Sequence, residues 1–240
     1  MSSTRWRYTQ DNPLWTTVDT YTMKHTHPPS RPNTSLLEST FTTSSNSSLP
    51  PYALSAPQAK FLALHLRTAH VTHALEIGTL GGYTALWLAT LNPDLYVTTI
   101  EANAHHAAVA RHNILQAGPS VSSRIEVLEG TALSILPRLR EEVHSGARPR
   151  FGFVFIDADK RSNWAYFSAA REMVLPRGVI CVDNVVRDGE LVDAGSADAS
   201  VRGSREVVER VGELEGVDAV VLQLVGEKGY DGWLWAVVDN

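Results

Sequence analysis

Short apolar runs and amphipathic stretches alternate along the chain from about residue 55 onward. Apolar runs of four to eight residues indicate buried strands, and stretches with a period near 3.6 residues indicate helices. The predicted strands cover residues 73–77, 95–100, 124–128, 151–156 and 179–182, and the predicted helices cover 83–91, 104–116, 132–139 and 163–174. Such alternation predicts an α/β domain whose parallel sheet is covered by helices on both faces.

The two ends of this regular region have patterns of their own. Ser55 followed by Gln58 is a capping box, so a helix is expected to begin there. After a helix near residues 200–213, apolar runs at 217–225 and 233–238 flank a glycine-rich turn. That spacing predicts a C-terminal antiparallel hairpin.

Residues 1–53 differ from the rest of the chain because Ser, Thr, Pro and Asn dominate them. We expect residues 27–51 to be extended or loosely ordered. Earlier apolar residues could form a short packed helix: Trp6, Tyr8, Leu14, Trp15, Val18, Tyr21 and Met23. Because aromatic side chains are seldom left in water, this arm is expected to dock on the body or on a partner subunit. The chain therefore divides into an N-terminal arm, 1–53, and a domain, 54–240.

Composition and charge exclude several classes of protein. The 240 residues are 43% hydrophobic and 20% charged, as in an ordinary globular protein, and the net charge of -5 argues against a general nucleic-acid binder. No apolar run approaches the ~20 residues that span a bilayer, and no secretory signal opens the chain. With one cysteine, Cys181, the chain has no intrachain disulfide. These features predict a cytoplasmic protein without membrane contacts.

A glycine-rich turn follows the first predicted strand and opens the next helix. Glycines at such a turn let the backbone approach a ligand. A dinucleotide fingerprint that starts at Gly78 would need glycines where Leu80 and Tyr83 stand, so hydride transfer is disfavoured. Glu76 would repel a phosphate but suits the ammonium group of an amino acid, and Glu101 is placed to bind ribose hydroxyls. The set favours a nucleoside ligand such as S-adenosylmethionine, although a generic turn beside a surface acid is the alternative.

Acidic residues follow two other predicted strands. The run 151–156 ends in Asp157-Ala158-Asp159-Lys160, and the run 179–182 ends in Asp183-Asn184. Ligands of open parallel sheets bind beyond the carboxyl ends of the strands. If these strands are neighbours, three oxygen donors converge, and hard oxygen donors select Mg²⁺-like cations. The alternative is that Asp and Asn merely begin turns.

Several segments together resemble the signatures of the cation-dependent O-methyltransferases, the group that includes caffeoyl-CoA and catechol O-methyltransferases. The segments are LEIGTLGGYT, FVFIDADKR, VDNVVRDG and GEKGYDG, and the resemblance, strongest to small bacterial-type members, covers about 51–238. It implies a Rossmann-like seven-stranded mixed sheet, with five parallel strands plus the C-terminal antiparallel hairpin. It also implies S-adenosylmethionine as methyl donor, a divalent cation, a small phenolic substrate and a homodimer.

The resemblance also assigns individual residues. It implies Asp157, Asp183 and Asn184 as metal ligands and Lys160 as the general base. It implies cofactor contacts from Leu54, Glu76, Gly78, Thr79, Thr84, Glu101, Ala132, Asp157 and Asp159, with Ser55 beside Leu54 at the edge of the site. Two positions depart from the family pattern: Thr131 replaces a commonly acidic residue, and Ala59 replaces a common glycine.

The mechanism expected from these residues starts with two adjacent oxygens of a phenol on the cation. The cation lowers the pKa of the hydroxyl, Lys160 takes its proton, and the oxyanion attacks the sulfonium methyl. Two other functions stay open at this point. One is a catalytically inactive cofactor-binding partner protein, which retention of the ligand positions and Lys160 disfavours. The other is a methyltransferase that acts on protein or RNA, and the acidic balance disfavours RNA.

Overall fold

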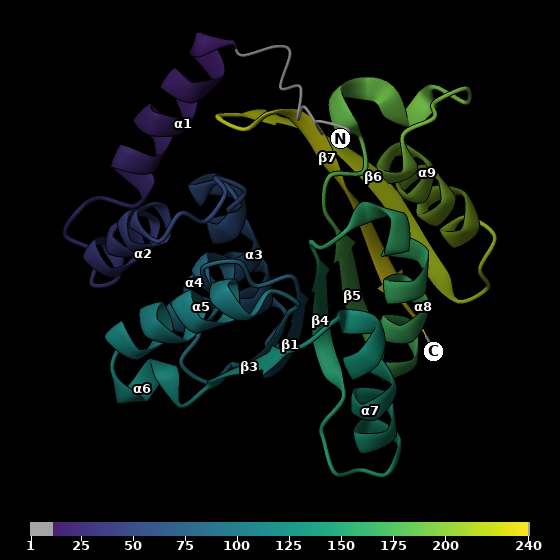
Figure 1. Cartoon of the computed structure of the whole chain (residues 1–240), viewed down its shortest axis with the longest axis horizontal. Coiled ribbons are helices and arrows are strands. Elements are labelled where there is room, and N and C mark those ends of the chain that lie inside the picture. Colours follow the sequence, from purple (N-terminus) through teal and green to yellow (C-terminus); the bar gives the residue numbers. More distant parts are fainter. Residues whose placement is uncertain (1–11, 240) are drawn as a thin grey trace.

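The computed structural model describes residues 12–239 and contains one seven-stranded sheet in the order β3-β2-β1-β4-β5-β7-β6 (Figure 1). The strands are β1 His73–Ile77, β2 Tyr96–Glu101, β3 Ile125–Glu129, β4 Phe151–Ile156, β5 Val174–Val182, β6 Val217–Gly226 and β7 Gly229–Val238. Strands β1 to β5 pair in parallel, and β7 pairs antiparallel with both β5 and β6. The predicted sheet, with its C-terminal hairpin, is confirmed.

Helices cover both faces of the sheet and bury a separate apolar cluster on each. One cluster lies under α7 Ala132–His144, α8 Asn163–Met173 and α9 Ala199–Val211. The other lies under α3 Ala56–Thr68, α4 Tyr83–Leu91 and α5 Ala104–Gln116. Shorter helices are α6 Pro119–Ser122, η1 Lys160–Ser162 and η2 Arg187–Val192. The capping box of Ser55 and Gln58 begins α3 as predicted.

Parallel pairing brings the carboxyl ends of the central strands to one edge of the sheet. The N–H of Asp157 donates to Ile77 O at 2.8 Å, which joins the end of β4 to the end of β1. The N–H of Asp183 donates to Ile156 O at 2.9 Å, which joins β5 to β4. The strands that end in Asp157 and Asp183 are therefore neighbours, as the site prediction requires.

The prediction that residues 27–51 are extended or loosely ordered is wrong. Residues Thr34–Asn46 form helix α2, which packs against α4 and α5 and buries Leu37 and Thr40. Several of its hydroxyl groups donate to carbonyls three or four residues earlier, including Thr40 to Leu36 O at 2.9 Å. Ser and Thr thus occupy helical positions with satisfied side chains. Leu37, Thr40, Phe41 and Ser44 recur at helical spacing, and the high content of Ser and Thr masked this pattern in the sequence.

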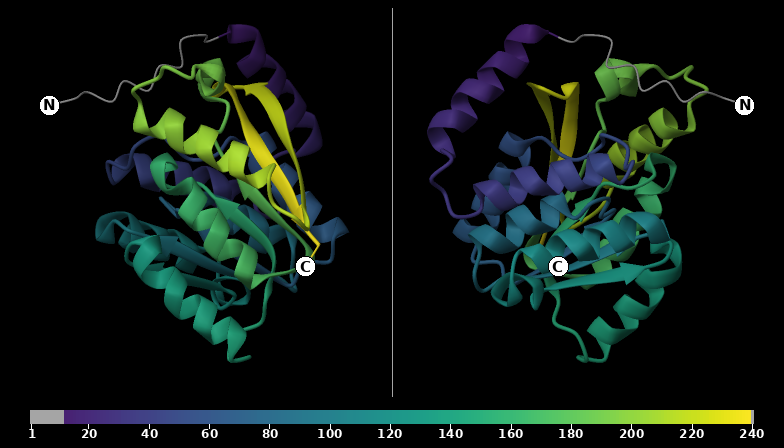
Figure 2. Two further views of the ribbon diagram at one scale, coloured as in Figure 1. Left: turned by 90° about the vertical axis from the view of Figure 1, so that its right-hand side faces the viewer. Right: turned by 60° about the vertical axis from the view of Figure 1, so that its left-hand side comes forward.

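The predicted first helix is present as α1 Pro13–Thr26, but none of its residues is buried. Figure 2 shows α1 standing off from the body beside the β6–β7 hairpin. Asp19 of α1 accepts the N–H of Glu227 at the hairpin tip at 2.8 Å, and Lys60 of α3 donates to Thr26 O at 2.5 Å. The packed helix that the sequence predicts is therefore only lightly docked on this chain. Trp6 and Tyr8 lie outside the described residues.

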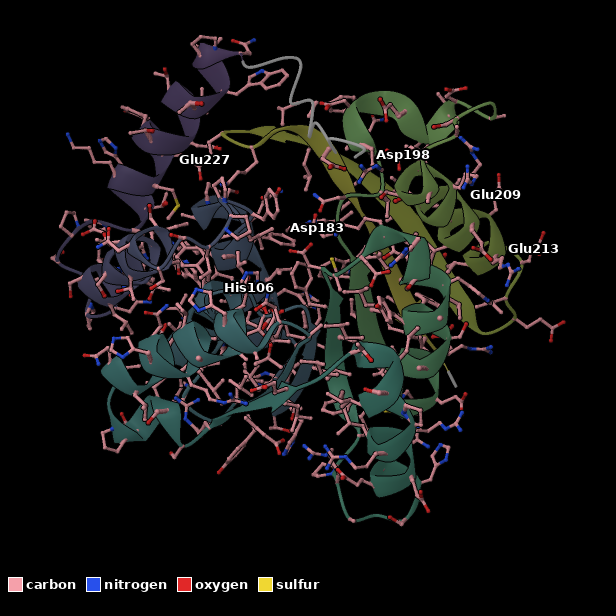
Figure 3. The ribbon with its side chains drawn as sticks, in the orientation of Figure 1. His106, Asp183, Asp198, Glu209, Glu213 and Glu227 are labelled. Carbon is pink, nitrogen blue, oxygen red and sulfur yellow. The ribbon has the colours of Figure 1, made fainter. Side chains whose placement is uncertain are left out.

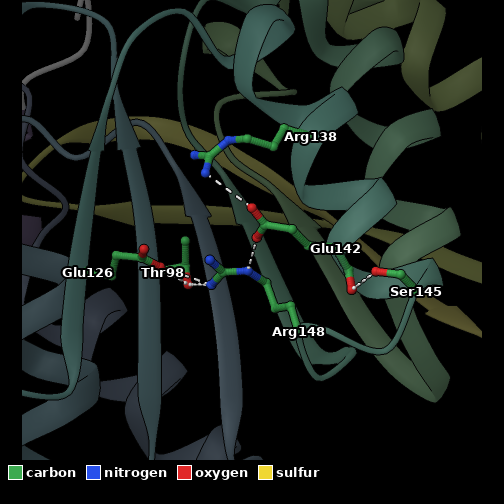
Figure 4. Close-up of polar contacts among 6 residues, drawn as sticks. All are labelled: Thr98, Glu126, Arg138, Glu142, Ser145 and Arg148. Carbon is green, nitrogen blue, oxygen red and sulfur yellow. Dashed lines mark hydrogen bonds and ion pairs between the residues drawn. The ribbon is translucent and has the colours of Figure 1, made fainter.

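The opposite edge of the sheet is tied by a charged network (Figure 4). Arg148 donates to Glu126 at 2.9 Å, to Glu142 at 2.8 Å and to the Thr98 hydroxyl at 3.0 Å. These bonds connect β2 and β3 to the end of α7, at a distance from the strand ends that carry the predicted site. None of the helices within residues 12–239 is both long enough and apolar enough to cross a membrane.

Candidate active site

A cavity of about 880 Å³ opens at the carboxyl ends of β1, β2, β4 and β5. Eleven of the twelve predicted site residues line it: Leu54, Gly78, Thr79, Thr84, Glu101, Ala132, Asp157, Asp159, Lys160, Asp183 and Asn184. Figure 3 labels Asp183, which lies near the centre of the view, between helices α2 to α5 on the left and helices α8 and α9 on the right. The strand ends thus gather nearly all of the predicted residues in one place. The exception is Glu76.

Glu76 lies behind the cavity wall and is 1% exposed. Thr79 lines the cavity, and its hydroxyl lies 2.5 Å from the Thr99 hydroxyl. Thr99 in turn donates to Glu76 Oε2 at 2.5 Å. Burial raises the pKa of Glu76 to about 8, and the nearby Asp157 and Glu101 carboxylates add to the rise, while the Thr99 bond opposes it. Glu76 is therefore linked to the cavity through a chain of hydroxyl groups.

Glu101 shapes the loop that closes the nucleotide end of the cavity. One carboxylate oxygen accepts the N–H of Thr79 at 3.2 Å and of Leu80 at 2.8 Å, and the other accepts the N–H of Asn103 at 2.9 Å. Carboxylates that accept several backbone N–H bonds are held firmly in place. Glu101 therefore orders the turn as well as facing the cavity.

Gly78 is required by a close approach between two strand ends. Its φ is +102°, and a Cβ at this position would lie 2.1 Å from the carbonyl oxygen of Asp157. A side chain is excluded both by the backbone conformation and by this contact. The glycine thus lets the turn after β1 lie against the segment after β4.

The chemical end of the cavity carries the acidic residues and Lys160. Lys160, 4% exposed, donates from Nζ to Asp157 Oδ1 at 2.7 Å. Asp183 Oδ1 accepts the indole N–H of Trp233 and the N–H of Asn184, each at 2.8 Å. Burial raises the pKa of Asp183 well above its ordinary value, and the neighbouring Asp157 raises it further. Two carboxyl groups are therefore held close together with limited access to water.

These residues fit a cation that prefers oxygen donors. Within residues 12–239, no three His, Cys, Asp or Glu side chains form a metal-binding group, and the third donor predicted from the sequence is the Asn184 amide. Asn184 has a φ of +55°, the left-handed conformation that Asn adopts more readily than most residues. The left-handed turn places this residue on the cavity wall beside Asp157 and Asp183.

The structure also places residues that the sequence did not assign to the site. Thr40, Phe41 and Ser44 of α2 and Asp19 of α1 line the cavity, although they belong to the arm. His106 also lines the cavity, and its Nδ1 lies 3.7 Å from Glu101 Oε1. Periodicity within the arm could have identified the α2 residues.

Two aromatic residues after Lys160 have different positions. Tyr166 lines the cavity and donates its hydroxyl to Asp159, which also accepts from Ser162 at 2.6 Å. Trp164 lies outside the cavity, where the Arg210 guanidinium is 4.9 Å from its ring centroid. Only Tyr166 can therefore contact a ligand in the cavity.

Comparisons with known proteins show to which family this chain belongs. The O-methyltransferase family model matches residues 29–226. The chain belongs to the O-methyltransferase family. It is 50% identical to the O-methyltransferase imqG of Aspergillus flavus over 96% of this chain and 93% of that protein. It is 44% identical to the catechol O-methyltransferase of Mycobacterium tuberculosis over 79% of this chain and 82% of that protein.

Solved structures agree with this assignment. The O-methyltransferase of Bacillus cereus, a complex with SAH, has a TM-score of 0.86 and 41% identity, over 94% of this chain and 99% of that one. TomG of Streptomyces achromogenes, a complex with SAM, has a TM-score of 0.86 and 34% identity, over 96% of this chain and all of that one. The sequence-based prediction of an O-methyltransferase is confirmed, and the family model extends further into the arm than the predicted resemblance.

Proposed function

We propose that this O-methyltransferase transfers the methyl group of S-adenosylmethionine to a hydroxyl of a small catechol-like phenol, with a divalent cation such as Mg²⁺. The observation that carries the proposal is the convergence of Asp157, Asp183, Asn184 and Lys160 in the cavity that also contains the Gly78 turn. The catechol O-methyltransferase among the relatives supports the choice of acceptor.

The proposed roles differ between the nucleoside end of the cavity and the end that carries Lys160. The Gly78 turn, Thr79, Thr84, Glu101 and Ala132 face the nucleoside end, with Leu54 at its edge. Asp159 is proposed to assist cofactor binding, and Glu76 to stabilise the cofactor's positive charge from behind the wall. S-adenosylmethionine would supply an electrophilic methyl group. Positioning of two bound reactants is the main contribution of the protein.

Asp157, Asp183 and Asn184 would hold the cation, which would lower the pKa of the acceptor hydroxyl. Lys160 is proposed to receive the hydroxyl proton at Nζ as the neutral amine and to become the ammonium form. Its bond to Asp157 Oδ1 keeps this nitrogen beside the proposed ligands. Phe61, Leu222 and Trp233 provide an apolar wall that suits an aromatic ring and excludes water.

The proposal includes a cytoplasmic homodimer without nucleic-acid or membrane partners. Leu14, Val18 and Tyr21 of α1 are 63%, 50% and 65% exposed, which supports coverage of this helix by a second subunit. The light docking of α1 on its own chain agrees with that arrangement.

Methyl transfer to a simple catechol tests the proposed function. We expect transfer from S-adenosylmethionine with Mg²⁺ and its loss after excess EDTA, because the cation activates the hydroxyl. Restoring Mg²⁺ should restore transfer. Product formation can be followed by mass spectrometry. Transfer that persists unchanged in EDTA would contradict the cation mechanism, and failure on a panel of catechols would contradict the acceptor class.

Lys160→Ala should lower turnover by about 100-fold or more, the usual contribution of a positioned general base. The affinity for S-adenosylhomocysteine, measured by calorimetry, should stay within about twofold. Arg138→Ala is the control, because Arg138 is a cation of α7 outside the cavity and its side chain is 57% exposed. Turnover of Lys160→Ala near that of the control would remove Lys160 from the mechanism.

A further inference from the structure

Trp233 of β7 contacts one of the proposed cation ligands directly. Its indole N–H donates to Asp183 Oδ1 at 2.8 Å, and the side chain is 2% exposed. From the sequence, Trp233 and Trp235 both suggest only packing on one face of a strand. The structure distinguishes them, since Trp233 donates the hydrogen bond to Asp183 and Trp235 packs edge-on against His65.

The contact follows from the pairing of β5 with β7. In the antiparallel register Val182 is opposite Leu234, so Asp183 and Trp233 occupy the next pair along the ladder. The N–H of Val185 donates to Gly232 O at 3.1 Å, which continues the pairing past Asp183. Two strands that are already paired therefore fix the distance between the indole and the carboxylate.

Packing also restricts the indole ring itself. The Trp233 ring centroid is 5.8 Å from that of Phe61 and 6.4 Å from that of Trp235. At the neighbouring Gly232, a Cβ would lie 2.3 Å from Leu222 O, so the backbone of β6 and β7 is closely apposed there. Side chains held by such packing keep one rotamer and can orient a partner.

The bonding pattern of Asp183 leaves its two carboxylate oxygens with different roles. Oδ1 accepts both the indole N–H and the N–H of Asn184. A carboxylate that is held through one oxygen presents the other in a defined direction. Metal-binding carboxylates are commonly oriented by such outer hydrogen bonds.

The donor type matters for a cation site. Indole N–H is a neutral donor with no acceptor capacity, so it orients the carboxylate without cancelling its charge. Lys160 at Asp157 is different, because an amine donor can also carry a positive charge that offsets the carboxylate. The indole therefore fixes the orientation of Asp183 without placing an opposing charge beside it.

We propose that Trp233 is a positioning residue that orients Asp183 for the divalent cation of this O-methyltransferase. The proposal rests on the cation site proposed above. Loss of an outer hydrogen bond of this kind typically lowers metal affinity 10- to 100-fold. A ring of similar shape that cannot donate should therefore weaken cation binding while the cofactor end of the cavity is unchanged.

The test compares Trp233→Phe with Trp235→Phe, a matched loss of indole on the same strand face. Binding of Mn²⁺ is measured by calorimetry on the full chain with S-adenosylhomocysteine present. We expect Trp233→Phe to weaken Mn²⁺ binding at least tenfold and Trp235→Phe to change it less than twofold. Affinity for S-adenosylhomocysteine without metal should be equal in both. A benzothienylalanine at position 233, which keeps the ring size but lacks the N–H, should reproduce the tenfold loss if Trp233→Phe folds poorly.

The outcomes separate this inference from the proposed function. If the wild-type chain binds no Mn²⁺, both the cation site and the role of Trp233 are overturned. If the wild type binds Mn²⁺ and the benzothienyl variant binds equally well, the cation site stands and the role of Trp233 is wrong. Equal losses in Trp233→Phe and Trp235→Phe would show a general packing effect and would also overturn the inference.

Discussion

Asp183→Asn should lower cation affinity at least about 100-fold, beyond the effect of losing one outer hydrogen bond. The amide keeps an oxygen that can accept from Trp233 and Asn184, so the local geometry is retained. What disappears is the negative charge that a hard cation requires. Catechol methylation should fall about 1000-fold, which corresponds to roughly 4 kcal/mol of lost transition-state stabilisation.

The measurement pairs steady-state turnover at saturating Mg²⁺ with Mn²⁺ calorimetry. Asp218→Asn serves as the control, because Asp218 is an exposed carboxylate on β6. Affinity for S-adenosylhomocysteine should be preserved in both variants. An Asp183→Asn enzyme that retains more than a tenth of wild-type turnover would show that Asp183 does not hold a required cation.

Much of the fold could be predicted because, in most segments, the spacing of apolar residues matches the residues that the fold buries. Strands β1 and β4 and helices α4 and α5 begin and end at the predicted residues. Their apolar runs are bounded by glycine or polar residues, so few alternative bounds exist. Helix α2 was missed because its buried face uses Thr34 and Thr40 as well as Leu37, and a count of hydroxyl residues hides this period.

The candidate site was predictable to the extent that it lies at strand ends. Asp157, Asp183 and Asn184 directly follow apolar strands, so topology alone brings them together. The role of Trp233 depends on the register between β5 and β7, which no local pattern specifies. The hydroxyl chain that ends at Glu76 was also not predictable, since Thr99 belongs to a different strand.

Glu76→Gln should stabilise the ligand-free protein at pH 8 and weaken cofactor binding. The pKa of Glu76 is raised to about 8, from an ordinary value of 4.5, mainly by burial. A raised pKa means that the folded protein favours protonated Glu76. The wild type is therefore most stable, with respect to this group, below pH 4.5, and loses that stability as the pH rises toward 8.

The glutamine resembles the protonated acid at every pH, so the variant avoids this loss. The difference in unfolding free energy between variant and wild type should grow across this window and reach on the order of 3 kcal/mol near pH 7. Urea unfolding at pH 5.5, 7 and 8.5 measures it, with the exposed Glu213→Gln as control.

Cofactor binding should change in the opposite direction. S-adenosylmethionine carries a positive charge, and a carboxylate just behind the wall attracts it through a medium of low dielectric constant. Above pH 8, where Glu76 is mostly ionised, removing that charge should lower affinity about tenfold, or roughly 1.4 kcal/mol. Because Thr79 and Thr99 connect the cavity to Glu76, the neutral amide can keep the hydroxyl chain while losing the attraction. A variant that is no more stable at pH 8.5 than at pH 5.5, relative to wild type, would show that Glu76 is ionised without cost in the folded chain.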